Sequence, residues 1–198
     1  QRYAHFKEAV AQDKAHRAGE AQEEIRFLLE NEDLACTLTD LHQAGKLPLR
    51  VTHNDTKINN VLFSPEDHSA LVVIDLDTVM PGLMGHDFGD AIRFAANRCE
   101  EDCPDPDKAG VDMEVFRSFA EGFLEKPAHA MTQAEADTLA ISCFCLTAEL
   151  AVRFLGDYLE GDPYFKTLYP EHNLVRTRCQ IALAKDMLAR RGEMENII

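Results

Sequence analysis

The chain has 198 residues, 45% of them apolar, and a formal net charge of −15 at pH 7. This length is enough for one well-packed core, and we expect a single domain over residues 1–198. The negative charge disfavours nucleic acids and anionic membranes as partners, because both repel an acidic surface. We expect a cytoplasmic enzyme, since we find no apolar run of membrane-spanning length and no signal-peptide pattern.

The first third of the chain is expected to be helical. A charged helical segment runs from Tyr3 to Ala18, and a second segment with an apolar stripe runs from Glu20 to Ala44. Gly45 and Pro48 end the second helix shortly before His53. Neither a Gly-rich phosphate loop nor a strand with an ATP-binding lysine precedes His53. We therefore expect that the N-terminal nucleotide-binding lobe is absent from this chain.

Residues 53–60 read His-Asn-Asp-Thr-Lys-Ile-Asn-Asn and have the spacing of a kinase catalytic loop. In kinases a metal-binding asparagine lies five residues after the catalytic aspartate, as Asn60 follows Asp55. Phosphoryl transfer requires positioning, charge neutralisation and an acceptor for the hydroxyl proton. We predict that Asp55 is that acceptor and that Lys57 offsets charge near the γ-phosphate, with an exposed loop lysine as the alternative. His53 is expected to support the loop structurally.

Two short apolar runs follow, Val61–Phe63 and Leu71–Ile74, with a segment of turn composition between them. They predict a β-hairpin with Asp75 at its end, returned towards the catalytic loop. Asn60 and Asp75 provide the oxygen ligands that Mg²⁺ prefers. Asp77 is expected either to bind a second Mg²⁺ or to hydrogen-bond the backbone. The predicted cofactors are Mg²⁺ and ATP, the latter as co-substrate.

Two other motifs overlap this stretch. The segment Asp75–Thr78 also matches the D-x-D-x-T signature of haloacid dehalogenase-like phosphatases, but residues 88–198 look helical, whereas that fold needs alternating strands and helices. Asp87 begins a D-F-G sequence that no apolar strand precedes. We expect Asp87 and Asp90 to cap an amphipathic helix that starts at Phe88.

The C-terminal half is expected to be helical after a surface loop at residues 98–110. The predicted helices run from about Val111 to Leu124, from a capping box at Thr132 to about Leu159, and from Glu171 to Arg191. Arg153 lies in the apolar middle helix and needs a partner, because an unpaired buried cation is costly. Glu149 and Asp157, each four residues away, offer a salt bridge. The six cysteines lack zinc-site spacing and are expected to be free thiols.

The loop at residues 53–60 and the segment at residues 74–77 resemble the aminoglycoside phosphotransferase and choline kinase group of protein-kinase-like small-molecule kinases. Residues 47–57, 73–83, 87–94 and 153–162 are similar to bacterial N-acetylhexosamine 1-kinases. The resemblance implies an α+β, mainly α fold: the C-terminal catalytic lobe of a kinase-like protein, with a small hairpin at the catalytic loop. It also implies ATP-dependent phosphorylation of the anomeric hydroxyl of an N-acetylhexosamine, with Asn54, Arg153 and Tyr164 contacting the sugar.

Other acceptors remain open within the same chemistry, namely choline, an aminoglycoside, homoserine or another sugar. A non-catalytic module that binds a small molecule is the alternative from a different class. The expected partners are therefore a small-molecule substrate and the missing N-terminal lobe, and we expect the chain alone to be inactive.

Overall fold

The computed structural model describes residues 1–125 and 130–198, which are mainly helical with two small antiparallel sheets. The expected mainly helical α+β class is confirmed. The α-helices are α1 (Arg2–Gln12), α2 (Gln22–Glu30), α3 (Glu32–Ala35), α4 (Thr37–Gln43), α5 (Met84–Ala95), α6 (Met113–Glu125), α7 (Gln133–Glu160), α8 (His172–Ala189) and α9 (Arg191–Ile197). The strands are β1 (Arg50–Thr52), β2 (Val61–Phe63), β3 (Ala70–Val73) and β4 (Met80–Gly82), and short 3-10 turns lie at 18–20, 58–60, 76–78 and 106–108.

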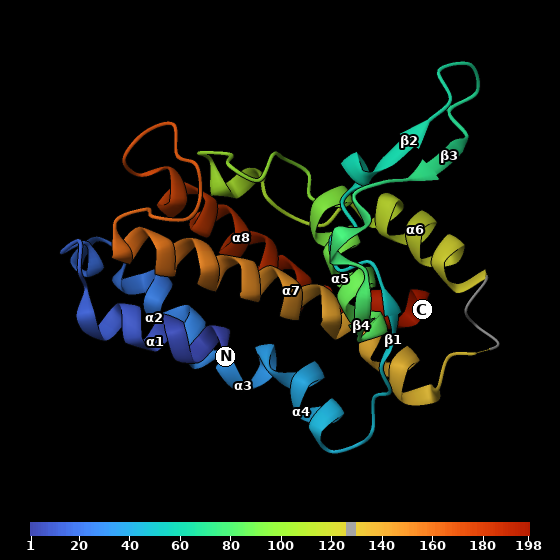
Figure 1. Cartoon of the computed structure of the whole chain (residues 1–198), viewed down its shortest axis with the longest axis horizontal. Helices are drawn as coiled ribbons and strands as arrows, with labels where there is room; N and C mark the ends of the chain where they lie inside the picture. The colour runs from blue at the N-terminus through green and yellow to red at the C-terminus, as the bar shows by residue number, and fades with distance from the viewer. Residues whose placement is uncertain (126–129) are drawn as a thin grey trace.

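Helix α7 runs through the middle of the molecule and packs against α1, α5 and α8 (Figure 1). Its length and composition would allow it to span a membrane, which differs from the expectation that no such run exists. However, 78% of its most apolar 18-residue window, with a mean hydropathy of 1.7, is buried within the protein. The apolar character of α7 is therefore explained by its position in the core.

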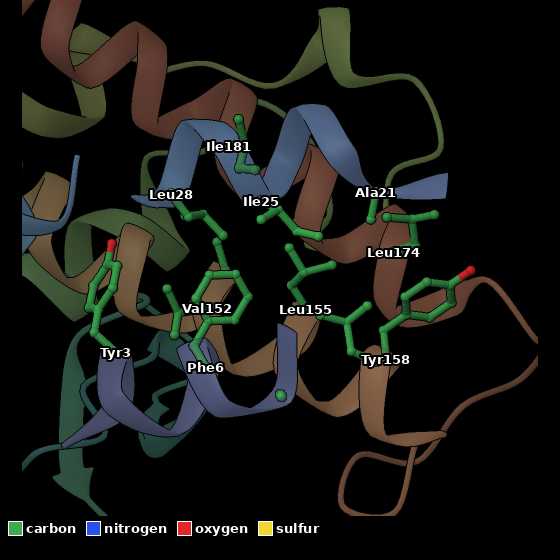
Figure 2. Packing of buried hydrophobic residues seen from close by; sticks show 13 residues of the cluster. Tyr3, Phe6, Ala21, Ile25, Leu28, Val152, Leu155, Tyr158, Leu174 and Ile181 are labelled. Atoms are coloured by element: carbon green, nitrogen blue, oxygen red, sulfur yellow. The ribbon is translucent and has the colours of Figure 1, made fainter. Parts of the chain in front are cut away.

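One core cluster joins both ends of the chain. Phe6 from α1 and Leu28 from α2 are fully buried against Leu155 of α7, and α8 adds Leu174 and Ile181 (Figure 2). Burying a side chain of this size stabilises the fold by about 1.5–3 kcal/mol. The N-terminal helices are thus part of the same body as the C-terminal ones.

The start of α7 is fastened to the strand that leads into the catalytic loop. Thr132 and Glu135 form the predicted capping box, in which each side chain bonds the other residue's backbone N–H. Glu135 also accepts two hydrogen bonds from Arg50 of β1, at 2.9 and 2.8 Å. The hydrogen bond from Arg50 and those from Thr132 lower the pKa of the Glu135 carboxyl to about 2. This carboxylate therefore sets the position of β1 relative to α7.

The expected helix between Glu20 and Ala44 is interrupted, and so is the last helix. The amide of Asn31 donates to the carbonyl of Phe27 at 2.8 Å, at the point where α2 ends. A side chain that bonds the backbone in this way competes with the helical ladder. Cys36 separates α3 from α4, and Arg190 separates α8 from α9.

The strands form two antiparallel pairs, β1 with β4 and β2 with β3. The second pair is the predicted hairpin, and it projects away from the helical body (Figure 1). All four residues of β3 are exposed, and Leu62 and Phe63 of β2 are also exposed. The hairpin is therefore apolar without being buried.

Candidate active site

The catalytic loop is held by α5 through its backbone. The Asp87 carboxylate accepts hydrogen bonds from the N–H groups of His53 and Asn54, both at 2.8 Å. The Asp90 carboxylate accepts one from the N–H of Thr56 at 3.0 Å. The prediction that Asp87 and Asp90 cap a helix starting at Phe88 is wrong, because α5 already begins at Met84 and both residues lie inside it. Their side chains instead accept hydrogen bonds from a loop more than thirty residues earlier in the sequence.

Asn54 has a left-handed backbone conformation with φ of 62°. Such a conformation is uncommon for residues other than glycine, and asparagine tolerates it better than most. Its amide donates to the carbonyls of Thr52 and Thr78, at 3.2 and 3.1 Å. A Cβ on Gly82 of β4 would overlap Thr52 and Asn54, so only glycine fits there. The Asn54 amide thus ties the loop to the strands, while the residue also lines the cavity described below.

Asp55, Lys57 and Asn60 meet in one group. The Asn60 amide donates to the carbonyl of Asp55 at 2.8 Å and to its carboxylate at 3.0 Å. The Lys57 ammonium lies 3.1 Å from the same carboxylate oxygen. Asn60 is buried, whereas the side chains of Asp55 and Lys57 are partly exposed. The carboxylate is therefore oriented by two neighbours and still open to a ligand.

His53 connects the catalytic loop to the end of the hairpin. Its Nε2 lies 3.0 Å from the carbonyl oxygen of Ile74, and because a carbonyl only accepts, Nε2 carries the proton. Its backbone carbonyl accepts from the Thr78 hydroxyl at 2.6 Å. In addition, the N–H of Ile74 donates to the carbonyl of Asn60 at 2.9 Å. These bonds fix Asp75, the next residue, beside the loop.

Asp75 and Asp77 form a carboxylate pair at this position. A hydrogen bond that the protonated Asp75 carboxyl donates to Asp77, together with the negative charges of Asp77 and Asp55, raises the pKa of Asp75 above its ordinary value. Asp75 has φ of 62°, a left-handed conformation that is uncommon for residues other than glycine but that aspartate tolerates better than most. A bound cation would relieve the repulsion between the two carboxylates.

This donor set fits Mg²⁺, which takes oxygen ligands and keeps several waters. Asn60, Asp75 and Asp77 are the residues that could hold it. Within residues 1–125 and 130–198, no group of three or more His, Cys, Asp or Glu side chains has the arrangement of a metal site built from protein ligands alone. A Mg²⁺ ion here would therefore complete its shell with water and phosphate oxygens. All six cysteines are free thiols, as expected.

A cavity of about 830 Å³ opens beside Asp55. One side is formed by the catalytic loop and by α5, and the other by α7, the segment 161–171 and α8. Arg153 of α7 and Tyr164 line the cavity together with Asp55, Lys57 and Asn54, which brings the predicted catalytic and substrate-binding residues to one site. His53 and Asp87 lie behind the loop and support it.

The alternative for Arg153, a salt bridge with Glu149 or Asp157 in place of a contact with the sugar, is not formed among the described residues. Glu149 lies 3.5 Å from Arg2 instead. Asp157 accepts from the N–H groups of Tyr164 and Phe165, at 2.9 and 3.0 Å, and so shapes the segment after α7. The Arg153 guanidinium packs 5.3 Å from the ring centroid of Phe165 and 5.9 Å from that of Tyr164. Both carboxylates that are close in sequence are occupied elsewhere.

Several residues that line the cavity were not predicted from the sequence. Arg93 of α5 pairs with Asp90 at 2.8 Å and with Glu101 at 2.7 Å, and all three line the cavity. Lys166 and Arg176 line it as well. No local motif marks these positions, because they come from α5, a loop and α8, and only the fold brings them together.

The match to a known family agrees with this geometry. The family model described as the phosphotransferase enzyme family matches residues 2–122, which is more than half of the chain. The chain belongs to the phosphotransferase enzyme family. The matched residues contain the catalytic loop, the hairpin and α5, so they include Asp55, Asn60 and Asp75 of this phosphotransferase.

Proposed function

We propose that this phosphotransferase is an ATP- and Mg²⁺-dependent kinase that transfers the γ-phosphoryl group to the anomeric hydroxyl of an N-acetylhexosamine. The observation that carries the proposal is that Asp55, held by Asn60 and Lys57, lies in the same cavity as Arg153 and Tyr164. The first three residues fit the chemistry of phosphoryl transfer. The last two are the positions at which the sequence resembles sugar 1-kinases.

The reaction needs a proton acceptor and charge neutralisation. The Asp55 carboxylate takes the proton of the acceptor hydroxyl while the new O–P bond forms and the bond between the γ-phosphorus and the ADP oxygen breaks. The Asn60 amide keeps that carboxylate oriented. Lys57 lies next to Asp55 and offsets the negative charge that gathers there. Mg²⁺, held by Asn60, Asp75 and Asp77, supplies neutralisation of the phosphate oxygens when it is bound.

The charges that line the cavity favour an acceptor that is not cationic. Choline and aminoglycosides are cations, which an excess of carboxylates in a site attracts and an excess of cationic side chains repels. Here four carboxylates face five cationic side chains: Asp55, Asp90, Glu101 and Glu149 against Lys57, Arg93, Arg153, Lys166 and Arg176. A neutral sugar fits this balance better than a polyamine does.

The exposed hairpin supports a second part of the proposal. Large exposed apolar surfaces usually mark a contact with a ligand or a partner. Leu62, Leu71, Val72 and Val73 are between 48% and 64% exposed, and Asp75 lies at the base of the same hairpin. We propose that ATP and a nucleotide-binding lobe cover this face in the active enzyme. The chain described here would then bind Mg-ATP weakly by itself.

The test uses the natural gene product that contains this chain. It is incubated with Mg-ATP and N-acetylglucosamine or N-acetylgalactosamine, and the ³¹P signal of the sugar 1-phosphate is followed. Wild-type protein should form the 1-phosphate, and Asp55→Asn should lower the rate by about 10²–10⁴-fold because the proton acceptor is lost. Asp33→Asn, at an exposed position of α3 outside the cavity, is the matched control and should keep the wild-type rate.

Each other outcome rejects a different part of the proposal. ADP formation with choline, homoserine or another alcohol, but not with the N-acetylhexosamines, would keep the kinase and reject the sugar. Full activity of Asp55→Asn would reject Asp55 as the proton acceptor. If no acceptor were phosphorylated but one of them bound, the chain would be a binding module.

A further inference from the structure

The cationic side chains at one end of the acceptor cavity lack carboxylate partners. The whole chain has 35 acidic and 20 basic residues, and 11 of the 19 lysines and arginines in the described part are in ion pairs. At the catalytic end, Lys57 and Arg93 are among the paired residues. Among the described residues, Arg153, Lys166 and Arg176 line the other end without any ion pair to a carboxylate. An acidic protein has therefore left three cations uncompensated in one cavity.

Arg176 is the best defined of the three. Its Nη1 donates to the carbonyl of Lys166 at 3.2 Å and to the side-chain oxygen of Asn173 at 3.1 Å. Its Nε is buried and has no hydrogen-bond partner among the described residues. A buried N–H without an acceptor costs about 1–3 kcal/mol, and a native structure usually has a reason for it. The N–H groups of Nη2, which are not buried and form no hydrogen bond within the described residues, are the donors of Arg176 that a ligand oxygen can reach.

Two phenylalanine rings hold the arginines in place. The guanidinium carbon of Arg176 lies 5.4 Å from the ring centroid of Phe154, and that of Arg153 lies 5.3 Å from the ring centroid of Phe165. The two rings pack against each other at 4.7 Å. Such cation–π contacts orient a guanidinium without using its N–H donors. Both arginines are thus positioned, and most of their donors remain available.

Lys166 completes the group from the segment between α7 and α8. Its side chain is exposed and lines the cavity, and its carbonyl anchors Arg176. The nearby carboxylate of Asp157 forms no ion pair with these cations within the described residues; its oxygens accept hydrogen bonds from the neutral N–H groups of Tyr164, Phe165 and Asn173.

We propose that Arg153, Lys166 and Arg176 form a subsite that binds an oxyanion, such as a phosphate or carboxylate group, carried by a ligand of the acceptor cavity. Guanidinium groups present planar arrays of N–H donors that match these oxyanions, and an ammonium adds a point charge. The inference rests on the proposed function only in taking this cavity as the acceptor site. The oxyanion belongs either to the acceptor itself, as a charged substituent far from the reacting hydroxyl, or to a separate phosphorylated molecule that occupies the cavity and inhibits.

The experiment measures binding by calorimetry, with the natural gene product and without Mg²⁺ or ATP. The probes are N-acetylglucosamine, N-acetylglucosamine 6-phosphate and inorganic phosphate. We expect the 6-phosphate to bind at least about tenfold more tightly than the neutral sugar, as charge-assisted hydrogen bonds allow. Raising the salt concentration to about 0.5 M should reduce this advantage, because salt screens exposed charges.

The variants assign the effect to the subsite. Arg176→Ala and, separately, Lys166→Ala should reduce the advantage of the 6-phosphate to threefold or less. Lys166 is exposed, so its replacement leaves the fold intact even if Arg176→Ala disturbs it. Arg117→Ala removes an exposed arginine of α6 outside the cavity and should change nothing. Equal binding of the neutral and phosphorylated sugars, or an advantage that persists in both Arg176→Ala and Lys166→Ala, would overturn the proposal.

Two further measurements distinguish the two possible sources of the oxyanion, and they distinguish a failure of the subsite from a failure of the proposed function. Conversion of the 6-phosphate to a bisphosphate with Mg-ATP would assign the oxyanion to the acceptor, whereas competition with N-acetylglucosamine without conversion would assign it to an inhibitor. Binding of inorganic phosphate that depends on Arg176, in a protein that phosphorylates no N-acetylhexosamine, would retain the subsite and reject the proposed function. Phosphorylation of the sugar without any Arg176-dependent binding of phosphate would retain the proposed function and reject the subsite.

Discussion

The hairpin and helix α7 use apolar residues in opposite ways. Val72 and Val73 in β3 are 49% exposed, while Leu139 and Leu155 in α7 are fully buried. Burial stabilises a fold, and exposure does not. The apolar residues of α7 therefore stabilise the body of the chain, whereas those of the hairpin contribute little to its stability. Substitutions in the two regions should separate stability from activity.

The largest effect on stability is expected from Leu155→Ala in α7. Leu155 packs between α1, α2 and α8 in the core cluster (Figure 2). Removing a buried leucine side chain costs about 2–5 kcal/mol, because contacts are lost and a cavity remains. Denaturant unfolding would measure the loss. Leu62→Ala in the exposed hairpin is the control and should change the free energy of unfolding by less than about 0.5 kcal/mol. Equal losses in the free energy of unfolding for Leu155→Ala and Leu62→Ala would show that the hairpin stabilises the fold as much as α7 does.

Glu135→Gln should lower stability by up to about 3 kcal/mol at pH 7. The pKa of Glu135 is depressed to about 2, so its contribution is fully present above the pKa of the unfolded chain. That contribution is lost as the pH falls towards 2. The wild type should therefore lose stability from about pH 5 to pH 2 more steeply than the variant does. Parallel pH profiles of the two proteins would show that Arg50 does not stabilise the Glu135 carboxylate.

Asp87→Asn should lower kcat by about 10- to 100-fold, the size of effect seen when a supporting group behind an active site is removed. One carboxylate holds the N–H groups of both His53 and Asn54, and the amide of asparagine can accept only one of these bonds. The KM for each substrate should stay within about threefold, because Asp87 does not line the cavity. A change confined to KM would show that Asp87 contacts a ligand.

Arg153→Ala should raise the KM for the acceptor by about tenfold and leave the KM for ATP within twofold. Arg153 lines the acceptor cavity, and a hydrogen bond to a charged donor contributes about 1.5–3 kcal/mol. It forms no salt bridge within the part of the chain that the structure describes, so its replacement should cost little stability. Steady-state kinetics with each substrate varied in turn would measure both constants. Equal increases in the KM for the acceptor and the KM for ATP would show that Arg153 does not act specifically on the acceptor.

Local sequence predicts which residues of the candidate catalytic loop and hairpin meet, but it predicts the lining of the cavity poorly. The spacing of Asp55 and Asn60, and the hairpin that returns Asp75, depend only on neighbouring residues, and the structure brings these three together. The capping role of Asp87 was wrong because its real partners, at His53 and Asn54, are 34 and 33 residues away.

Arg153 illustrates a further limit of local rules. A salt bridge with Glu149, the alternative to a ligand contact, suits the spacing on a single helix, but Glu149 lies 3.5 Å from Arg2, near the other end of the chain. Arg176 was not identified, because α8 reaches the cavity only after α7 and α8 have packed together. Contacts between distant segments determine which side chains remain available for a ligand.

The exposed hairpin also has a consequence for the chain in solution. Strands β2 and β3 pair only with each other in the described structure, so each has an outer edge with free backbone groups next to apolar side chains. Two copies could join through such edges. The net charge of −15 opposes this at low ionic strength, and added salt screens it. The purified chain should therefore remain monomeric in dilute buffer and self-associate reversibly as salt is raised, which light scattering would follow.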